Sequence, residues 1–137
     1  MRSHNELSDH EFTLQFSTGR LPEQMFTHEA HLRLAWLHIQ QYGADKACRT
    51  VADLIKNFAF ALGAKAKFNM TVTVAAVKTV HHFMQKSTSE YFEEFIAEFP
   101  KLRDNFNELL AKHYSRDIHS MAIAKHVYVE PDKLPFR

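Results

Sequence analysis

Glycine and proline are scarce in this chain, with three glycines and four prolines among 137 residues. The many tight reversals of a β-sandwich or barrel depend on such turn formers, whereas long helices need few of them. Twelve phenylalanines, together with many aliphatic residues, supply enough apolar side chains for a core. We therefore predict an all-α fold, with residues 1–137 forming a single domain of five to six helices in orthogonal or bundle-like packing.

Apolar periodicity and capping residues place the expected helices. They span residues 28–42, 45–62, 69–86, 88–99 and 101–113, followed by a short helix through 125. The expected N-caps are Thr27, Asp45, Asn69, Ser87 in a capping box with Glu90, and Ser115 or Ser120. Gly43 and Gly63 are expected to stop the first two helices.

The two ends and one connector depart from this helical pattern. Phe12, Leu14 and Phe16 alternate with polar residues, so residues 1–21 are expected to form an extended or irregular arm. Prolines restrict the residues before them, which favours an extended tail over 127–137. Residues 64–68 read as a basic connector between two helices.

Charge and cysteine content set expectations about partners and compartment. The chain has 17 basic and 16 acidic residues, which gives no electrostatic basis for nucleic-acid binding. No apolar run approaches 18 residues, so no membrane partner is expected, and the first six residues lack a signal-peptide core. A single cysteine, Cys48, cannot form an internal disulfide, which favours a reducing, cytoplasmic location.

Histidine is the unusual residue, with ten copies. On a helical wheel, His28, His31 and His38 point away from the charged arc that holds Glu29 and Arg33. Histidines three residues apart share a face, so His28 and His31 are candidate ligands for a divalent metal such as zinc. The alternative is a structural pair that is hydrogen-bonded near the helix start.

The third expected helix offers a polar counterpart, because Asn69 and Thr73 fall on its apolar face. Buried amides and hydroxyls need partners, and pairing with His28 and His31 would leave a polar pocket in the core. Alternatively, Asn69 caps its own helix and Thr73 bonds the carbonyl one turn back. Tyr114 is a further candidate for lining the pocket, with a role in the core as the alternative.

Four segments also resemble a family of small, uncharacterised, all-helical bacterial proteins. In that family the pattern is F-T-H-x-x-H-L-x-x-A-W, then Y-H-x-T-x-T, then Y-S, then a V-E-P-D tail. The matching segments in this chain are Phe26–Trp36, Phe68–Thr73, Tyr114-Ser115 and Val129–Asp132.

The resemblance implies a pocket that joins His28 and His31 to position 69. Asn69 stands where the family pattern has histidine, and an amide is a poor zinc ligand. The similarity therefore supports a polar site more than a metal site, and it implies no particular activity.

Two function hypotheses follow. In the first, the protein binds a small molecule or metal through His28 and His31, with Asn69 and Thr73 orienting the ligand, and whether it is an enzyme stays open. In the second, it is a non-catalytic helical interaction module or homo-oligomer whose histidines are structural, with exposed aromatic residues as anchors.

Overall fold

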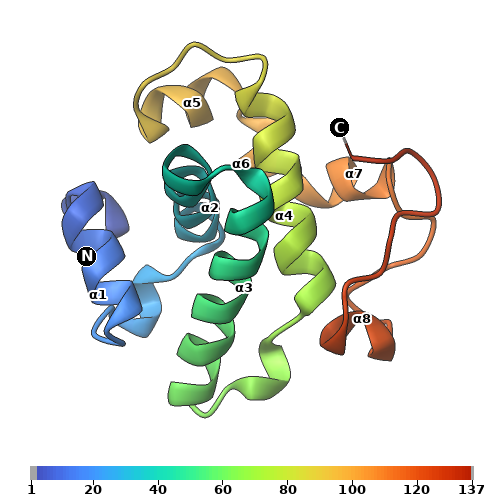
Figure 1. Cartoon of the computed structure of the whole chain (residues 1–137), viewed down its shortest axis with the longest axis horizontal. Helices are drawn as coiled ribbons and strands as arrows, with labels where there is room; N and C mark the ends of the chain where they lie inside the picture. The colour runs from blue at the N-terminus through green and yellow to red at the C-terminus, as the bar shows by residue number, and fades with distance from the viewer. Residues whose placement is uncertain (1–2, 137) are drawn as a thin grey trace.

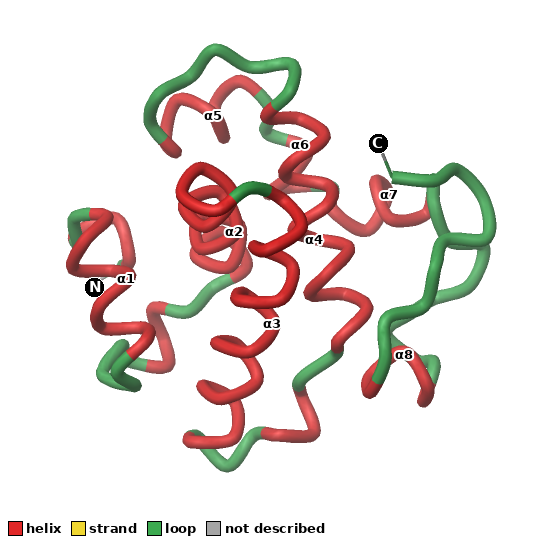
Figure 2. Tube along the Cα trace, in the orientation of Figure 1, coloured by secondary structure: helices red, strands yellow, loops and turns green. Residues whose placement is uncertain are grey.

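The computed structural model describes residues 3–136 and is all-α, as predicted. Helices make up 66% of the structure, and no described residue lies in a strand (Figure 2). The eight α-helices are α1 (Asp9–Ser17), α2 (His28–Tyr42), α3 (Ala44–Ala61), α4 (Met70–Met84), α5 (Phe92–Glu98), α6 (Lys101–Asp104), α7 (Phe106–Ala111) and α8 (Ala122–His126). Short 3-10 helices lie at His4–Glu6, Glu23–Met25 and Lys65–Lys67.

Five of the eight helices have seven or more residues, close to the predicted five to six. Among residues 3–136, no helix has both the length and the apolarity needed to span a bilayer. Residues 1–2 of the expected arm and residue 137 of the expected tail lie outside the described range.

Helices α2, α3 and α4 pack against one another at the centre of the molecule (Figure 1). The apolar stripe of α3 is buried in this core through Val51, Ile55 and Phe58. Helix α4 is covered by α2 and α3 and also contacts α8, so apolar residues fill most of its faces. This central unit fixes the orientation of the N-terminal turns of α2, where the predicted histidines lie.

The predicted boundaries of the central helices are confirmed to within one or two residues. The Thr27 hydroxyl accepts a hydrogen bond from the Ala30 amide, and the Asn69 side chain accepts one from the Val72 amide. Gly43 has a φ of 84°, a conformation in which a side chain would be strained, and it separates α2 from α3. Because Gly43 itself precedes α3, which begins at Ala44, the expected cap at Asp45 is wrong.

The expected N-terminal arm is wrong, because residues 9–17 form the helix α1. A capping box starts it, with the Ser8 hydroxyl bound to the Glu11 amide and the Glu11 carboxylate bound to the Ser8 amide. Phe12 and Phe16 are buried four residues apart on one helical face, whereas Leu14 is 52% exposed. The alternation was therefore part of a helical period, not of a strand.

The segment after α4 also differs from prediction. The expected capping box at Ser87 is absent, since the Ser87 and Ser89 hydroxyls donate to the Glu98 carboxylate and α5 begins only at Phe92. The helix predicted over 101–113 is divided into α6 and α7 at Asn105, whose φ of −136° and ψ of 39° are not helical. Helix α8 follows Met121, without a capping serine side chain.

Candidate functional site

A cleft of about 430 Å³ opens beside the first turns of α2, between α4 and the α6–α7 segment. We call it the histidine cleft. Its polar lining residues are His28, His31, Arg103, Asp104, Asn105, Asn107, Glu108 and His119, and its apolar ones are Val72, Ala76 and Phe106. Helix α2 brings His28 and His31 to the cleft because Thr27 starts the helix immediately before them.

His28 is exposed and held in place by one hydrogen bond. Its Nε2 lies 2.9 Å from the Leu102 carbonyl oxygen, and its ring centroid lies 4.9 Å from that of Phe106. A carbonyl oxygen only accepts, so Nε2 carries the proton and donates it. In the neutral ring, Nδ1 is then the nitrogen that remains available as an acceptor.

His31 is half-buried, and its Nε2 is buried without a hydrogen-bond partner. Burial, helped by repulsion from the nearby His28, lowers the pKa of His31 from 6.5 to about 4. The ring, stacked at 5.8 Å on Phe26, is therefore neutral at physiological pH. A buried polar atom without a partner is costly, and here it belongs to a residue that lines an open cleft.

Most of the remaining polar groups of the histidine cleft come from the break between α6 and α7, and His119 comes from the segment between α7 and α8. Arg103 forms a two-point ion pair with Asp104, at 2.9 Å and 3.2 Å. His119, which lies across the cleft, is paired through Nδ1 with Asp117 at 3.0 Å. Sequence reasoning missed these residues, because a continuous helix over 101–113 would not have the irregular turn at Asn105.

Asn69 and Thr73 do not pair with His28 and His31, so the expected contact across the core is wrong. The Asn69 amide caps α4 and donates to the Ile118 carbonyl at 3.0 Å. Thr73 donates to the Asn69 carbonyl at 2.8 Å, one turn back in the same helix. Asn69 and Thr73 therefore make the local hydrogen bonds that were the alternative to a shared pocket. Helix α4 lines the cleft with Val72 and Ala76 instead.

His38 and Tyr114 also lie outside the histidine cleft. His38 is buried between α2 and α3, 3.1 Å from the Thr50 hydroxyl, and burial lowers its pKa. The buried Tyr114 hydroxyl donates to the Val129 carbonyl at 2.7 Å, and burial raises its pKa. Tyr114 lines an adjacent hollow of about 500 Å³, which also contains His119.

Polar side chains of α4 and of the segment after α7 hold the C-terminal tail in place. Thr71 donates to the Val127 carbonyl at 2.9 Å and accepts from the Val129 amide at 3.0 Å. The Asp132 carboxylate binds both the amide and the hydroxyl of Ser115. These side chains have structural partners, and Thr71, which is fully buried, is the one at a position that a core would otherwise fill with an apolar residue. Ser115 and Asp132 are exposed.

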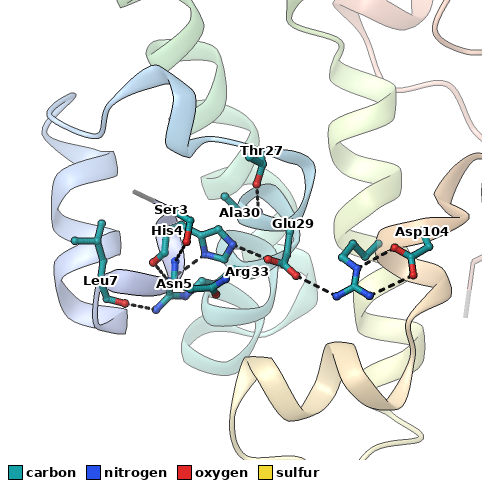
Figure 3. Close-up of polar contacts among 10 residues, drawn as sticks. Ser3, His4, Asn5, Leu7, Thr27, Glu29, Ala30, Arg33 and Asp104 are labelled. Atoms are coloured by element: carbon teal, nitrogen blue, oxygen red, sulfur yellow. Dashed lines mark hydrogen bonds and ion pairs between the residues drawn. The ribbon is translucent and has the colours of Figure 1, made fainter. Parts of the chain in front are cut away.

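On the other side of α2, a polar network ties the N-terminal segment to the helix (Figure 3). His4 Nε2 lies 3.0 Å from the Glu29 carboxylate, and its Nδ1 lies 3.2 Å from the Arg33 guanidinium. Arg33 also donates to the His4 and Leu7 carbonyls and pairs with Asp9. Arg33 was expected in solvent, but the N-terminal segment covers it and leaves it only 6% exposed.

Metal binding gains no support from this arrangement. Across residues 3–136, no group of three or more His, Cys, Asp or Glu side chains is placed to hold a metal ion. Zinc sites use three or four protein ligands. The predicted pair of His28 and His31 therefore lacks a third ligand within the described part of the chain.

Comparisons with protein-family models, curated proteins and solved structures found no match to this chain.

Proposed function

We propose that the protein binds a small polar molecule, neutral or zwitterionic, in the histidine cleft. The observation that carries this proposal is the buried Nε2 of His31, which has no partner in a residue that lines the cleft. A bound molecule that displaced the side chains covering this nitrogen and hydrogen-bonded to it would remove the cost of leaving it unpaired.

The charges of the cleft favour a ligand without a large net charge. Arg103 is already paired with Asp104, and Glu108 lies on the same wall. His31 is neutral because its pKa is about 4. The remaining groups, which are imidazoles and the amides of Asn105 and Asn107, both donate and accept, as the hydroxyl, amide or amino-acid groups of a small metabolite require.

Proton NMR of the histidine rings tests the proposal, with glycine, glutamine, glucose and glycerol as probes. We expect at least one probe to shift the His31 and His28 signals in a saturable way. The double variant His28→Ala, His31→Ala should lose that binding while its helical circular dichroism persists. His10→Ala, which removes an exposed histidine from α1, is the matched control and should bind as the wild type does.

Binding that survives in the double variant would show that the probe occupies another site. If no probe moves either histidine signal, the proposed ligand class is wrong.

Self-association is the second candidate, and it rests on exposed apolar side chains. Ile123 of α8 is 61% exposed, and Val127, which directly follows the helix, is 51% exposed. A light-scattering mass equal to one chain at high concentration would rule it out, whereas a dimer that Ile123→Ser dissociates would support it.

A further inference from the structure

A second cleft, of about 450 Å³, lies between the end of α3, the basic connector and α8. It is lined by Lys56 and Phe60 of α3, Lys65 and Ala66 of the connector, Phe68, and Lys125 and His126 of α8. We call it the lysine cleft. Figure 1 shows the connector between α3 and α4 at the lower edge of the molecule, where the lysine cleft is formed.

The charge of the lysine cleft is uncompensated. Lys56, Lys65 and Lys125 line it, and no aspartate or glutamate does. Within the described residues, none of these three lysines forms an ion pair with a carboxylate. Since the chain as a whole has 17 basic and 16 acidic residues, this excess is local, and such a concave cationic surface attracts anions.

An exposed aromatic ring accompanies the charges. Phe60 is 49% exposed, although phenylalanine is usually buried. The ammonium groups of Lys56 and Lys65 each lie 5.7 Å from its ring centroid. Phe68, only 8% exposed, forms an apolar floor. Both ammonium groups lie over the ring, so a flat ligand ring would pack on Phe60 by displacing at least one of them, and the displaced ammonium would then pair with the anionic group of the ligand.

Lys125 is held in position on the other wall. Its Nζ donates to the Ala66 carbonyl at 2.9 Å, which uses one of its three donors and leaves two available. The hydrogen bond spans from α8 to the connector and so orders the ammonium group before any ligand arrives. A preordered cation loses less side-chain freedom on binding than a free one.

We propose that the lysine cleft binds a small anion with a flat aromatic ring, of the nucleoside phosphate class. The base would stack on Phe60, and the phosphate oxygens would accept hydrogen bonds from Lys56, Lys65 and Lys125. The volume of about 450 Å³ falls within the range of small-molecule sites. This site shares no residue with the histidine cleft and does not depend on the function proposed for it.

Calorimetric titration with adenosine 5′-diphosphate, adenosine and inorganic pyrophosphate tests the proposal on the full chain. We expect adenosine 5′-diphosphate to bind most tightly, with an affinity that falls as salt is raised. In the triple variant Lys56→Ala, Lys65→Ala, Lys125→Ala, the affinity for adenosine 5′-diphosphate should fall by at least about tenfold. Lys46→Ala is the matched control, because Lys46 also lies on α3, 4.5 Å from the Tyr42 ring, but outside the cleft.

Phe60→Ala separates stacking from charge. The affinity for adenosine 5′-diphosphate should fall by about tenfold, as expected for loss of one base–aromatic contact, and the affinity for pyrophosphate should stay unchanged. The side chain is half exposed, so the variant is expected to fold.

Four results would overturn the proposal. Adenosine could bind as tightly as its diphosphate, or Lys46→Ala could weaken binding as much as the triple variant. Binding could instead depend on Lys101 and Lys112, which line a different basic cleft. Finally, the protein could bind phosphatidylcholine vesicles only when they contain phosphatidylserine and ignore the nucleotide, which would assign the surface to a membrane.

Discussion

The two sides of the N-terminal half of α2 differ in whether their polar side chains have hydrogen-bond partners. On one side, Glu29 and Arg33 join His4 in a network in which every charged group has a partner (Figure 3). On the other side, His31 keeps a buried nitrogen without a partner, beside an open cleft. Residues 29–33 of one helix therefore contain both a completed polar cluster and an incomplete one.

This difference separates groups that stabilise the fold from groups that are available to a ligand. Removing a member of a completed network leaves its partners unpaired and costs free energy of unfolding. Removing an unpaired group leaves no other group without a hydrogen bond. Its removal should therefore change the free energy of unfolding little and affect ligand binding alone. Substitutions on each side of α2 test whether the two sides differ in this way.

Arg33→Met should have the largest effect on stability. The guanidinium supplies hydrogen bonds to two carbonyls, to His4 and to Asp9 from a side chain that is almost fully buried. We expect the free energy of unfolding to fall by about 3 to 5 kcal/mol, measured by urea denaturation at pH 7.

Arg49→Met is the matched control, because Arg49 is exposed on α3. It should change the free energy of unfolding by no more than about 0.5 kcal/mol. If Arg33→Met cost as little as this control, the network would not hold the N-terminal segment.

Arg33 also shows where sequence reasoning ends. The fold class, the bounds of α2 and the caps at Thr27 and Asn69 follow from local signals, namely periodicity, capping side chains and glycine stops. The burial of Arg33 does not follow from local signals, because the segment that covers this side chain lies 26 to 29 residues away in the sequence. A helical wheel sorts residues by polarity and cannot detect a cover made of backbone carbonyls.

The same limit applies to the histidine cleft. His28 and His31 line the same cleft, but their expected partners Asn69 and Thr73 are engaged elsewhere. Their actual neighbours, Arg103 and Asp104, lie before a helix break at Asn105 that no glycine or proline marks. No local sequence signal therefore marks that break.

His31→Phe should affect stability only in acid. The pKa of His31 falls from 6.5 to about 4 on folding, so folding favours the neutral ring. Above pH 6.5 the ring is neutral in both states and contributes no pH dependence. As the pH falls from 6.5 to 4, the unfolded chain takes up the proton first, and the wild type loses up to about 3 kcal/mol.

The variant lacks this titration, so its free energy of unfolding should fall less steeply between pH 6.5 and pH 4. Urea denaturation across this range, with His10→Phe as the control for loss of an exposed imidazole, measures the difference. At pH 7 the stability of His31→Phe should stay within about 1 kcal/mol of the wild type, because no partner is left unpaired. If the free energy of unfolding fell equally steeply between pH 6.5 and pH 4 in variant and wild type, His31 would be accessible to protons in the folded state.

Glu29→Gln should have the smallest effect, and it tests whether the two sides of α2 are independent. One Glu29 oxygen accepts from His4, and the other lies 3.5 Å from Arg103, which lines the histidine cleft and is 45% exposed. A glutamine oxygen still accepts from His4, so the loss is that of a partly exposed ion pair, about 1 kcal/mol or less at pH 7. Burial alone would raise the pKa of Glu29, but hydrogen bonds from His4, Asn5 and Arg103 bring it below its ordinary value.

The stability that the charged Glu29 adds is therefore present at neutral pH and is lost as the pH falls through the lowered pKa. The free energies of unfolding of wild type and Glu29→Gln, measured by urea denaturation, should differ at pH 7 and become equal in acid. Arg103 stays fixed by Asp104 in the variant, so the His31 NMR signal and any probe binding in the histidine cleft should be unchanged. A shift of the His31 signal in Glu29→Gln would show instead that the N-terminal network sets the geometry of the cleft, and the two sides of α2 would then act as one site.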